Sequence, residues 1–182
     1  MGRHGYGAGR RRGGAAGPRG RAQGGARAFD GRSRHGGGRR LDGLLRITGW
    51  TQPAQRPDVD WTQMESRLGA ALPSDYKRMV ETFGVDAFDG YLALIQEPWT
   101  NLREDGLLVW AGTEDEDLYC WRAGGDGPDR RPVVVRSFDD KDVPFDRQAA
   151  EFVCRVLVGP DHRFTMARCF YPHWFMNYQQ RD

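Results

Sequence analysis

The stretch GLLVWAGTEDEDLYCWRAGGDGPDRRPVVVRS, residues 106–137, decides the fold that this sequence predicts. It holds three short runs rich in aromatic and aliphatic residues, at 107–110, 118–122 and 133–136, separated by acidic turns that contain Gly and Pro. Runs of this length and composition, bounded by turn residues, are typical of β-strands. We therefore predict a β-meander. The stretch contains neither a nucleophile beside a base nor the spacing of metal ligands.

Two amphipathic helices are predicted before the meander. The first spans residues 61–68 and is capped by Asp60, whose side-chain oxygen can accept a backbone N–H of the first turn. The second spans residues 75–83, with Ser74 as its predicted cap and Gly84 after its end. In both segments apolar residues recur at spacings of three and four, which places them on one face. We expect the two helices to pack as a pair.

The other elements complete an α+β fold. They are a strand at 88–95 beginning at an Asp-Gly turn, a loop at 96–105, a short strand at 143–145, a helix at 147–158 capped by Asp146, and an edge strand within 169–178. Pro172 restricts that last strand to an edge or a bulge, because proline cannot donate a ladder hydrogen bond. The predicted architecture is an N-terminal helix pair, a largely antiparallel sheet and a C-terminal helix packed on the sheet, preceded by a disordered tail.

Charge divides the chain into two parts. Eleven Arg and a single acid, Asp30, give residues 1–40 a net charge of +10, so the total of +2 leaves −8 for residues 41–182. The first part has too few apolar residues to offset the entropy cost of ordering. We predict a disordered Arg/Gly-rich tail at 1–40 and one folded domain at 41–182.

The tail has two interpretations. Arg-Gly repeats with occasional aromatic residues can bind single-stranded nucleic acid through phosphate charge and base stacking. The same composition also arises from a GC-rich reading frame, in which case the segment is a solvated leader, or is translated from a start codon placed too far upstream. We favour this second interpretation, and we expect nucleic acid as a partner only through the tail.

The sequence predicts a cytoplasmic protein without membrane contact. The apolar residues after Arg39 and Arg40 are too few for an export segment, and no window approaches the eighteen or so apolar residues of a membrane helix. Cys120, Cys154 and Cys169 are odd in number and widely spaced, as buried free thiols are. They lack the paired spacing of a zinc site, so we expect no metal and no cofactor.

A set of short motifs along residues 44–160 carries a resemblance to a known family. In the helical part they are Trp61, Glu65, Leu72, Pro73, Tyr76 and Gly84; in the meander they are Trp110, Gly112, Thr113, Asp117 and Trp121; segments 132–135 and 149–152 follow. In this order they resemble the SUKH superfamily, specifically its SMI/KNR type. The resemblance implies structural roles for Trp61, Tyr76, Trp110, Gly112, Thr113 and Trp121.

The chain departs from the family pattern in three places. Glu116 stands where the family usually carries Gly, and Arg131 stands where an aromatic residue is common before the Val-rich strand. The segment between residues 95 and 106 is also short, so that a helix often found there is missing. These departures fall in turns and connections, and the core motifs are kept.

The resemblance implies a binding function and no enzyme activity. Bacterial members resemble immunity proteins of polymorphic toxin systems, which neutralise a cognate toxin, often a nuclease, by occluding it. Fungal relatives are interaction hubs that regulate cell-wall synthesis. The acidic domain fits the first role, because nucleases are generally basic and opposite fields speed encounter. The alternative is a nucleic-acid-associated or regulatory scaffold protein that uses the Arg/Gly-rich tail.

Candidate partner-binding residues concentrate in the turn of the meander. They are Trp99, Glu114, Asp115, Glu116, Asp117 and Arg131. The four consecutive carboxylates lack the alternating spacing of a calcium loop, and they suit Arg or Lys of a basic protein partner. The competing interpretation is a solvated hairpin turn. Trp99, beside Pro98 in the predicted loop, is the tryptophan expected at the surface.

An unassigned hydrolase is a third hypothesis. It would use either Cys169 as a nucleophile, with His162 or His173 as a base, or the carboxylates at 114–117, and no substrate can be named for it. Nothing in the sequence places either histidine beside the thiol, so we expect the protein not to be an enzyme.

Overall fold

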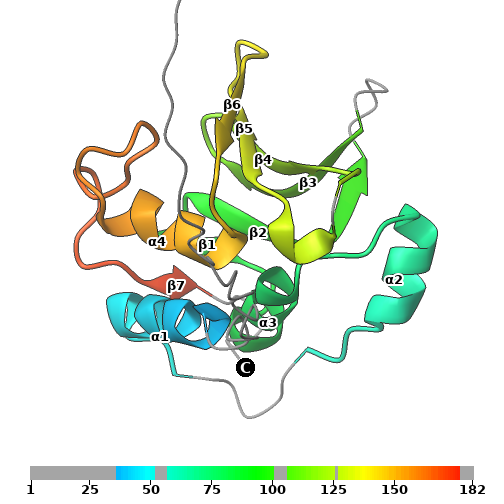
Figure 1. The fold of residues 1–182 in the computed structure, drawn as a ribbon. Helices are drawn as coiled ribbons and strands as arrows, with labels where there is room; N and C mark the ends of the chain where they lie inside the picture. The colour runs from blue at the N-terminus through cyan, green and yellow to red at the C-terminus, as the bar shows by residue number, and fades with distance from the viewer. Residues whose placement is uncertain (1–35, 52–56, 101–105, 126, 177–182) are drawn as a thin grey trace, which may run out of the picture. The chain divides into compact units, whose positions relative to one another are not determined.

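The structure, a computed structural model, describes residues 36–51, 57–100, 106–125 and 127–176. Its elements are α1 (Gly36–Thr48), α2 (Trp61–Leu68), α3 (Ser74–Phe83), β1 (Ala87–Phe88), β2 (Leu92–Thr100), β3 (Leu107–Thr113), β4 (Leu118–Arg122), the 3₁₀ turn η2 (Pro128–Arg130), β5 (Val133–Arg136), β6 (Asp142–Phe145), α4 (Ala149–Val158) and β7 (Phe175–Met176) (Figure 1). In the described ranges, none of the helices combines the length and the apolar content needed to span a bilayer.

The strands form one antiparallel sheet in the order β6-β5-β4-β3-β2-β1-β7. Helices α1, α3 and α4 contact one another on one side of the sheet (Figure 1). Helix α2 lies next to β2 and contacts α3 through side chains: Trp61 Nε1 donates to Glu81 at 2.8 Å, and Lys77 pairs with Glu65 at 2.5 Å. The predicted α+β class, the meander and the C-terminal helix on the sheet are confirmed. The helical part has one more member than predicted, α1.

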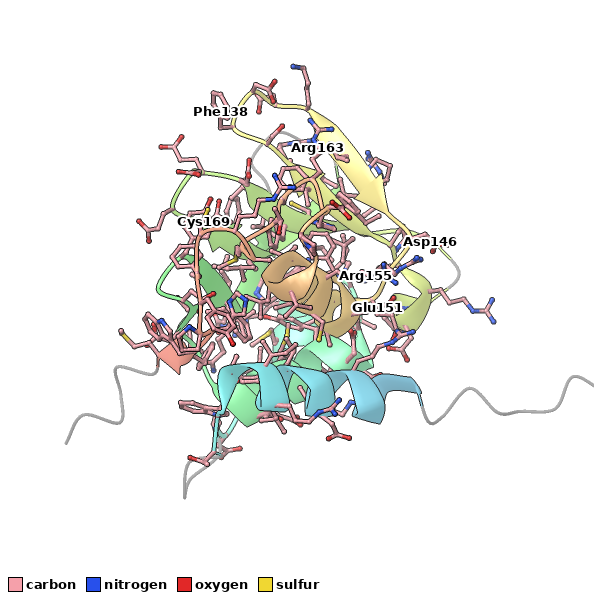
Figure 2. All side chains as sticks on the ribbon, turned by 90° about the vertical axis from the view of Figure 1, so that its left-hand side faces the viewer. Phe138, Asp146, Glu151, Arg155, Arg163 and Cys169 are labelled. Carbon is pink, nitrogen blue, oxygen red and sulfur yellow. The ribbon has the colours of Figure 1, made fainter. Side chains whose placement is uncertain are left out.

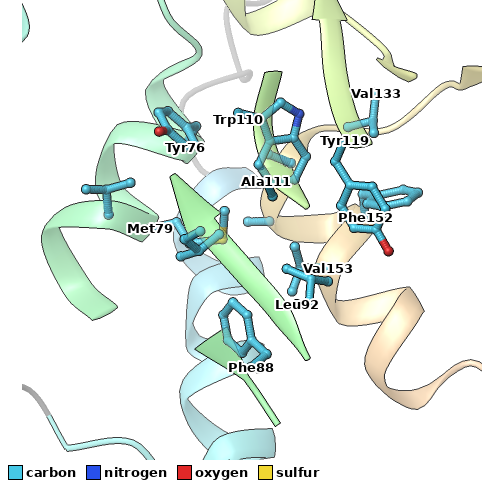
Figure 3. Packing of buried hydrophobic residues seen from close by; sticks show 14 of the residues in the cluster. Tyr76, Met79, Phe88, Leu92, Trp110, Ala111, Tyr119, Val133, Phe152 and Val153 are labelled. Carbon is cyan, nitrogen blue, oxygen red and sulfur yellow. The ribbon is translucent and has the colours of Figure 1, made fainter. Parts of the chain in front are cut away.

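The main core lies between the sheet and these helices (Figure 3). Trp110 and Trp121, on neighbouring strands, are fully buried and stack with ring centroids 5.1 Å apart. Tyr76 of α3 meets both indoles edge-on, at 6.0 and 5.0 Å. Its hydroxyl donates to the carbonyl of Ile95, which joins α3 to β2. Trp61 of α2 is only half-buried and packs against the outside of this cluster.

The helix α1 was not predicted, and it crosses the expected boundary between residues 40 and 41. Leu44 is fully buried in the core. Arg40 donates to Gln148 at 2.9 Å and pairs with Glu151 at 2.9 Å, both near the start of α4. Most of the predicted tail, residues 1–35, lies outside the described residues. Any truncation that removes the tail must therefore stop before Gly36.

The predicted loop at 96–105 is wrong in its first half. Strand β2 continues to Thr100, with an irregular register between Leu94 and Trp99, so Trp99 lies on a strand and pairs with Val109 of β3. The bulge allows the strand to pass Pro98, which cannot donate to a ladder. Residues 101–105 lie outside the described ranges. The predicted strand at 88–95 is divided by the turn at Asp89 into β1 and β2.

Two of the three predicted helix caps are wrong. Asp60 does cap α2, accepting Gln63 N–H at 2.9 Å. Neither Ser74 nor Asp146 acts as a cap, because α3 begins at Ser74 itself and α4 begins only at Ala149.

The caps of α3 and α4 come from distant parts of the chain. Asp129 of η2 accepts Ser74 N–H at 2.6 Å. Asp75 of α3 accepts Ala150 N–H at 2.9 Å, and its carboxyl group is buried. Such contacts satisfy the free N–H groups of a helix start as a local cap does, but they become visible only in the folded chain.

The C-terminal strand is at the sheet edge as predicted, but it is shorter. Strand β7 covers Phe175–Met176 and pairs with β1. Asp89 fixes the residues before it by accepting Trp174 N–H at 2.9 Å and contacting His173 Nδ1 at 2.7 Å. Pro172 and Cys169 precede the strand, and residues 177 and 178 lie outside the described part.

Candidate functional site

Two turns of the meander and the segment after α4 surround a hollow of about 650 Å³. Its lining comes from residues 114–117 between β3 and β4, residues 137–139 after β5, and Arg163 with Phe164. Figure 2 shows Phe138 and Arg163 near each other at one end of the sheet. Five of the nine lining residues are acidic, so we call this hollow the acidic groove.

The β3–β4 turn is held by its own backbone. Thr113 N–H donates to Asp117 O at 3.0 Å, and Glu116 N–H donates to Thr113 O at 3.0 Å. The hydroxyl of Thr113 accepts Asp117 N–H at 3.2 Å. Glu116 has φ +66°, the left-handed conformation that glycine adopts most readily. This geometry directs the acidic side chains outward while the strands on either side stay paired.

Tyr91 supports the turn from the neighbouring hairpin. Its hydroxyl donates to Asp115 Oδ2 at 2.7 Å, and its carbonyl accepts Glu114 N–H at 3.2 Å. Burial and the charge of Asp115 raise the pKa of Tyr91 to about 12, so it stays a hydrogen-bond donor at neutral pH. The sequence did not single out Tyr91, which follows the Asp-Gly turn in the chain and reaches the groove through the β2–β3 pairing.

Asp117 joins the two turns. Its Oδ1 accepts Phe138 N–H at 3.3 Å. Burial raises the pKa of Asp117, and the charges of Asp115 and Asp139 raise it further, against the opposing effects of the Phe138 N–H and of Arg163. The neighbouring charges of Asp115 and Asp139 thus disfavour a charge on Asp117, and a partner's cation would offset this repulsion.

The second turn carries an acid and an exposed ring. Asp139 pairs with Lys141 and accepts the Ser137 hydroxyl at 2.6 Å, and these two bonds lower the pKa of Asp139. Between Ser137 and Asp139, the side chain of Phe138 is 76% exposed. A large apolar ring in water and beside carboxylates marks a contact surface more specifically than either feature alone.

The remaining wall is basic and aromatic. The guanidinium carbon of Arg163 lies 5.5 Å from the centroid of the Phe164 ring, and its charge acts on Asp117. The sequence offered no signal for either residue, because both come from the connection after α4.

Two predicted site residues lie elsewhere. Trp99 is 41% exposed, as expected, but it lies near the C-terminal end of β2, opposite Val109. Arg131 lies at the other end of β4 and β5, about 16 Å along the strand from Arg136 beside the groove. Its guanidinium donates to Ala71 O at 2.6 Å, which ties the β4–β5 connection to the start of α3.

The three cysteines do not line the groove, and His162 lies behind its Arg163–Phe164 wall. Cys120 is buried, Cys154 is half-buried with its pKa raised by burial to about 11, and Cys169 is exposed. The expectation of three buried thiols is therefore wrong for Cys169, which lies in a turn. In the part of the chain that the structure describes, no three His, Cys, Asp or Glu residues are placed to hold a metal ion.

The groove therefore offers carboxylates, an exposed ring and a turn braced by Tyr91 and Thr113. These groups suit non-covalent recognition of a cationic surface, in which charge guides the encounter and the ring supplies buried contact. Comparisons of the chain with protein-family models, with curated proteins and with solved structures find no match.

Proposed function

We propose that this protein is a non-enzymatic binding module that neutralises a basic protein, most concretely an immunity protein of a polymorphic toxin system. The observation that carries this proposal is the acidic groove, in which Phe138 projects between the carboxylates of two meander turns. The net charge of −8 over residues 41–182 acts in the same direction. A basic nuclease is the toxin class that such a field would attract.

The resemblance to SMI/KNR-type SUKH domains supports the same proposal. Its most specific residues lie in the strands and turn that form one side of the groove, with Thr113 bonding across that turn. Glu116 stands where the family usually has Gly, and its positive φ is the conformation that would favour Gly there. The turn of this chain thus has a backbone conformation that would suit Gly at this position, with an extra carboxylate in its place.

Neutralisation would proceed in two physical steps. The acidic field first raises the rate of encounter with a basic surface, by about 10- to 1,000-fold for well-matched charges. Phe138 then enters an apolar site of the partner while Arg or Lys side chains meet Asp115, Asp117 and Asp139. The toxin is blocked by occlusion, which needs no reaction at the interface.

Growth rescue tests the proposal. A toxin domain encoded by a gene adjacent to that of this protein is expressed in bacteria alone and with the protein, which we expect to restore growth. The variant Glu114→Gln/Asp115→Asn/Glu116→Gln keeps the shape of the turn, including an acceptor for Tyr91, but removes three charges. We expect this variant to associate at least tenfold more slowly at low salt and to rescue poorly.

A charge-matched control separates the groove from net charge. Asp42→Asn/Asp58→Asn/Asp146→Asn also removes three exposed carboxylates, on α1, before α2 and after β6. We expect it to rescue as the unchanged protein does. Failure of the unchanged protein to rescue, or equal rescue by the groove variant, would contradict the proposal.

A further inference from the structure

His162 lies in the turn after α4, beside the two residues that form one wall of the acidic groove. The backbone N–H of His162 donates to Gly159 O at 3.0 Å, and the backbone N–H of Thr165 donates to His162 O at 3.1 Å. Arg163 and Phe164 lie between these two bonds in the chain and line the groove. The position of the wall therefore depends on this turn.

The imidazole of His162 is enclosed by phenylalanine rings from three parts of the chain. Phe145 of β6 stacks on it with centroids 5.0 Å apart, and Phe152 of α4 meets it edge-on at 5.4 Å. The ring of Phe164 lies 6.4 Å away. Its Nε2 atom is buried and has no hydrogen-bond partner among the described residues. This environment withholds water from Nε2 and disfavours a charge on the ring.

The other ring nitrogen holds the groove wall directly. Phe164 N–H donates to His162 Nδ1 at 3.2 Å. This bond requires a lone pair on Nδ1, so the ring is neutral and its proton is on Nε2. A second proton would place an N–H of the ring against the N–H of Phe164, and the bond would be lost.

The charges near His162 add to this effect. Burial lowers the pKa of His162, and the positive charge of Arg155, one turn before Gly159 on α4, lowers it further (Figure 2). The nearest acid on the same helix, Glu151, already bonds to Arg155 and to Arg147. Asp146 follows β6 in the chain, and Asp161 and Arg163 flank the histidine. The faces of the phenylalanine rings attract a cation and so favour protonation of His162. Desolvation and the loss of Nδ1 as the acceptor of Phe164 N–H disfavour it.

We propose that His162 is an acid-sensitive latch: protonation breaks its bond to Phe164 N–H and releases the Arg163–Phe164 wall of the acidic groove. The folded turn holds the neutral ring, so its closed form is fully stabilised above the ordinary histidine pKa of about 6.5. That stabilisation is lost as the pH falls below this value toward the lower pKa of the folded state. The effect on a partner rests on the proposed function, whereas the opening of the turn does not.

Amide hydrogen exchange of Phe164, followed by NMR in the full chain from pH 7.5 to 5.0, tests the latch. Each rate is divided by the intrinsic exchange rate at the same pH. We expect the protection of Phe164 to fall by up to about tenfold per pH unit below about 6.5, while amides of β4 and β5 keep theirs. Protection of Phe164 that does not depend on pH would overturn the proposal.

Two variants make the test specific. In His162→Asn the carboxamide oxygen can take the place of Nδ1 as acceptor but does not titrate, so Phe164 should stay protected throughout. Arg155→Gln removes the neighbouring positive charge. The midpoint pH at which the Phe164 amide loses its protection should then move upward, toward about 6.5. The same loss of protection in His162→Asn, or an unmoved midpoint in Arg155→Gln, counts against the latch. Failure of growth rescue would remove the proposed function and leave these measurements unaffected.

Discussion

The acidic groove and the junction of α3 with α4 both concentrate carboxylates, but they use them differently. In the junction, Asp75 and Asp129 each accept a backbone N–H from the start of a helix. In the groove, the exposed Glu114 and Glu116 project from a turn that is closed by backbone hydrogen bonds and by the Thr113 hydroxyl, without their own carboxylates. The oxygens of Asp75 and Asp129 accept hydrogen bonds from the backbone and so stabilise the fold. Those of Glu114 and Glu116 face solvent and are available to a partner. Substitutions in each region should therefore affect different properties.

Among the carboxylates of these two regions, the largest effect on stability is expected at Asp75. Asp75→Ala removes a buried acceptor and leaves Ala150 N–H without a partner, which should lower the free energy of unfolding by about 2–3 kcal/mol. Asp75→Asn keeps an acceptor and should cost less. Urea unfolding at neutral pH measures both variants. Equal losses would show that the carboxyl oxygen is not what holds the start of α4.

The same residue sets a pH dependence. Burial raises the pKa of Asp75 above its ordinary value, against the opposing N–H groups of Ala150 and Tyr76, so the fold favours the neutral carboxyl more than the unfolded chain does. The stability that it contributes is present below the unfolded-state pKa of about 3.9 and is lost as the pH rises through the folded-state value. The unchanged protein should therefore gain stability relative to Asp75→Asn as the pH falls toward 4.

Phe138 should behave in the opposite way. Phe138→Ala removes an exposed side chain, and the free energy of unfolding should change by less than about 0.5 kcal/mol. If the ring anchors a partner, Phe138→Ala should weaken binding to the neutralised toxin domain by about 2 kcal/mol, or roughly 30-fold. Titration calorimetry measures this change. Phe88, fully buried beside Phe83 and Phe175, is the contrasting position, where alanine should cost about 3–5 kcal/mol of stability. A large loss of stability at Phe138 would place it among the structural residues.

The smallest effect is expected at Glu116. Glycine relieves the positive φ of this residue, so Glu116→Gly should stabilise the fold by about 0.5–1 kcal/mol. Glu114→Gly, at a position outside the left-handed region, should give no such gain. Thermal unfolding of the two variants decides between them, and a loss at Glu116 would mean that its side chain contributes to the turn.

Much of the groove was contained in the meander prediction. In an up-and-down meander, alternate turns share one end of the sheet, so the turns at 114–117 and 137–139 had to meet and Arg131 had to lie at the opposite end. The wall formed by Arg163 and Phe164 could not be predicted, because a connection after a helix has no register to fix it. The family resemblance stays a prediction.

The errors in the helices have a common physical cause. Ser74 and Asp146 have the composition of local caps, yet α3 and α4 are capped across the fold by Asp129 and Asp75. The two residues of each contact are 55 and 75 positions apart, respectively. Contacts over such separations give no local pattern that could be recognised in the sequence. Helix α1 was missed because glycines and arginines open it, and its membership of the core depends on packing against α4.

One edge of the described sheet has a consequence for how chains meet. Strand β6 is outermost there, and its Pro144, opposite Val134, has no N–H to offer to an incoming strand. An edge strand that lacks a backbone donor in this way resists the addition of a further strand, and with it aggregation. Strand addition at the β6 edge should therefore be disfavoured, which leaves recognition at this edge of the sheet to side chains.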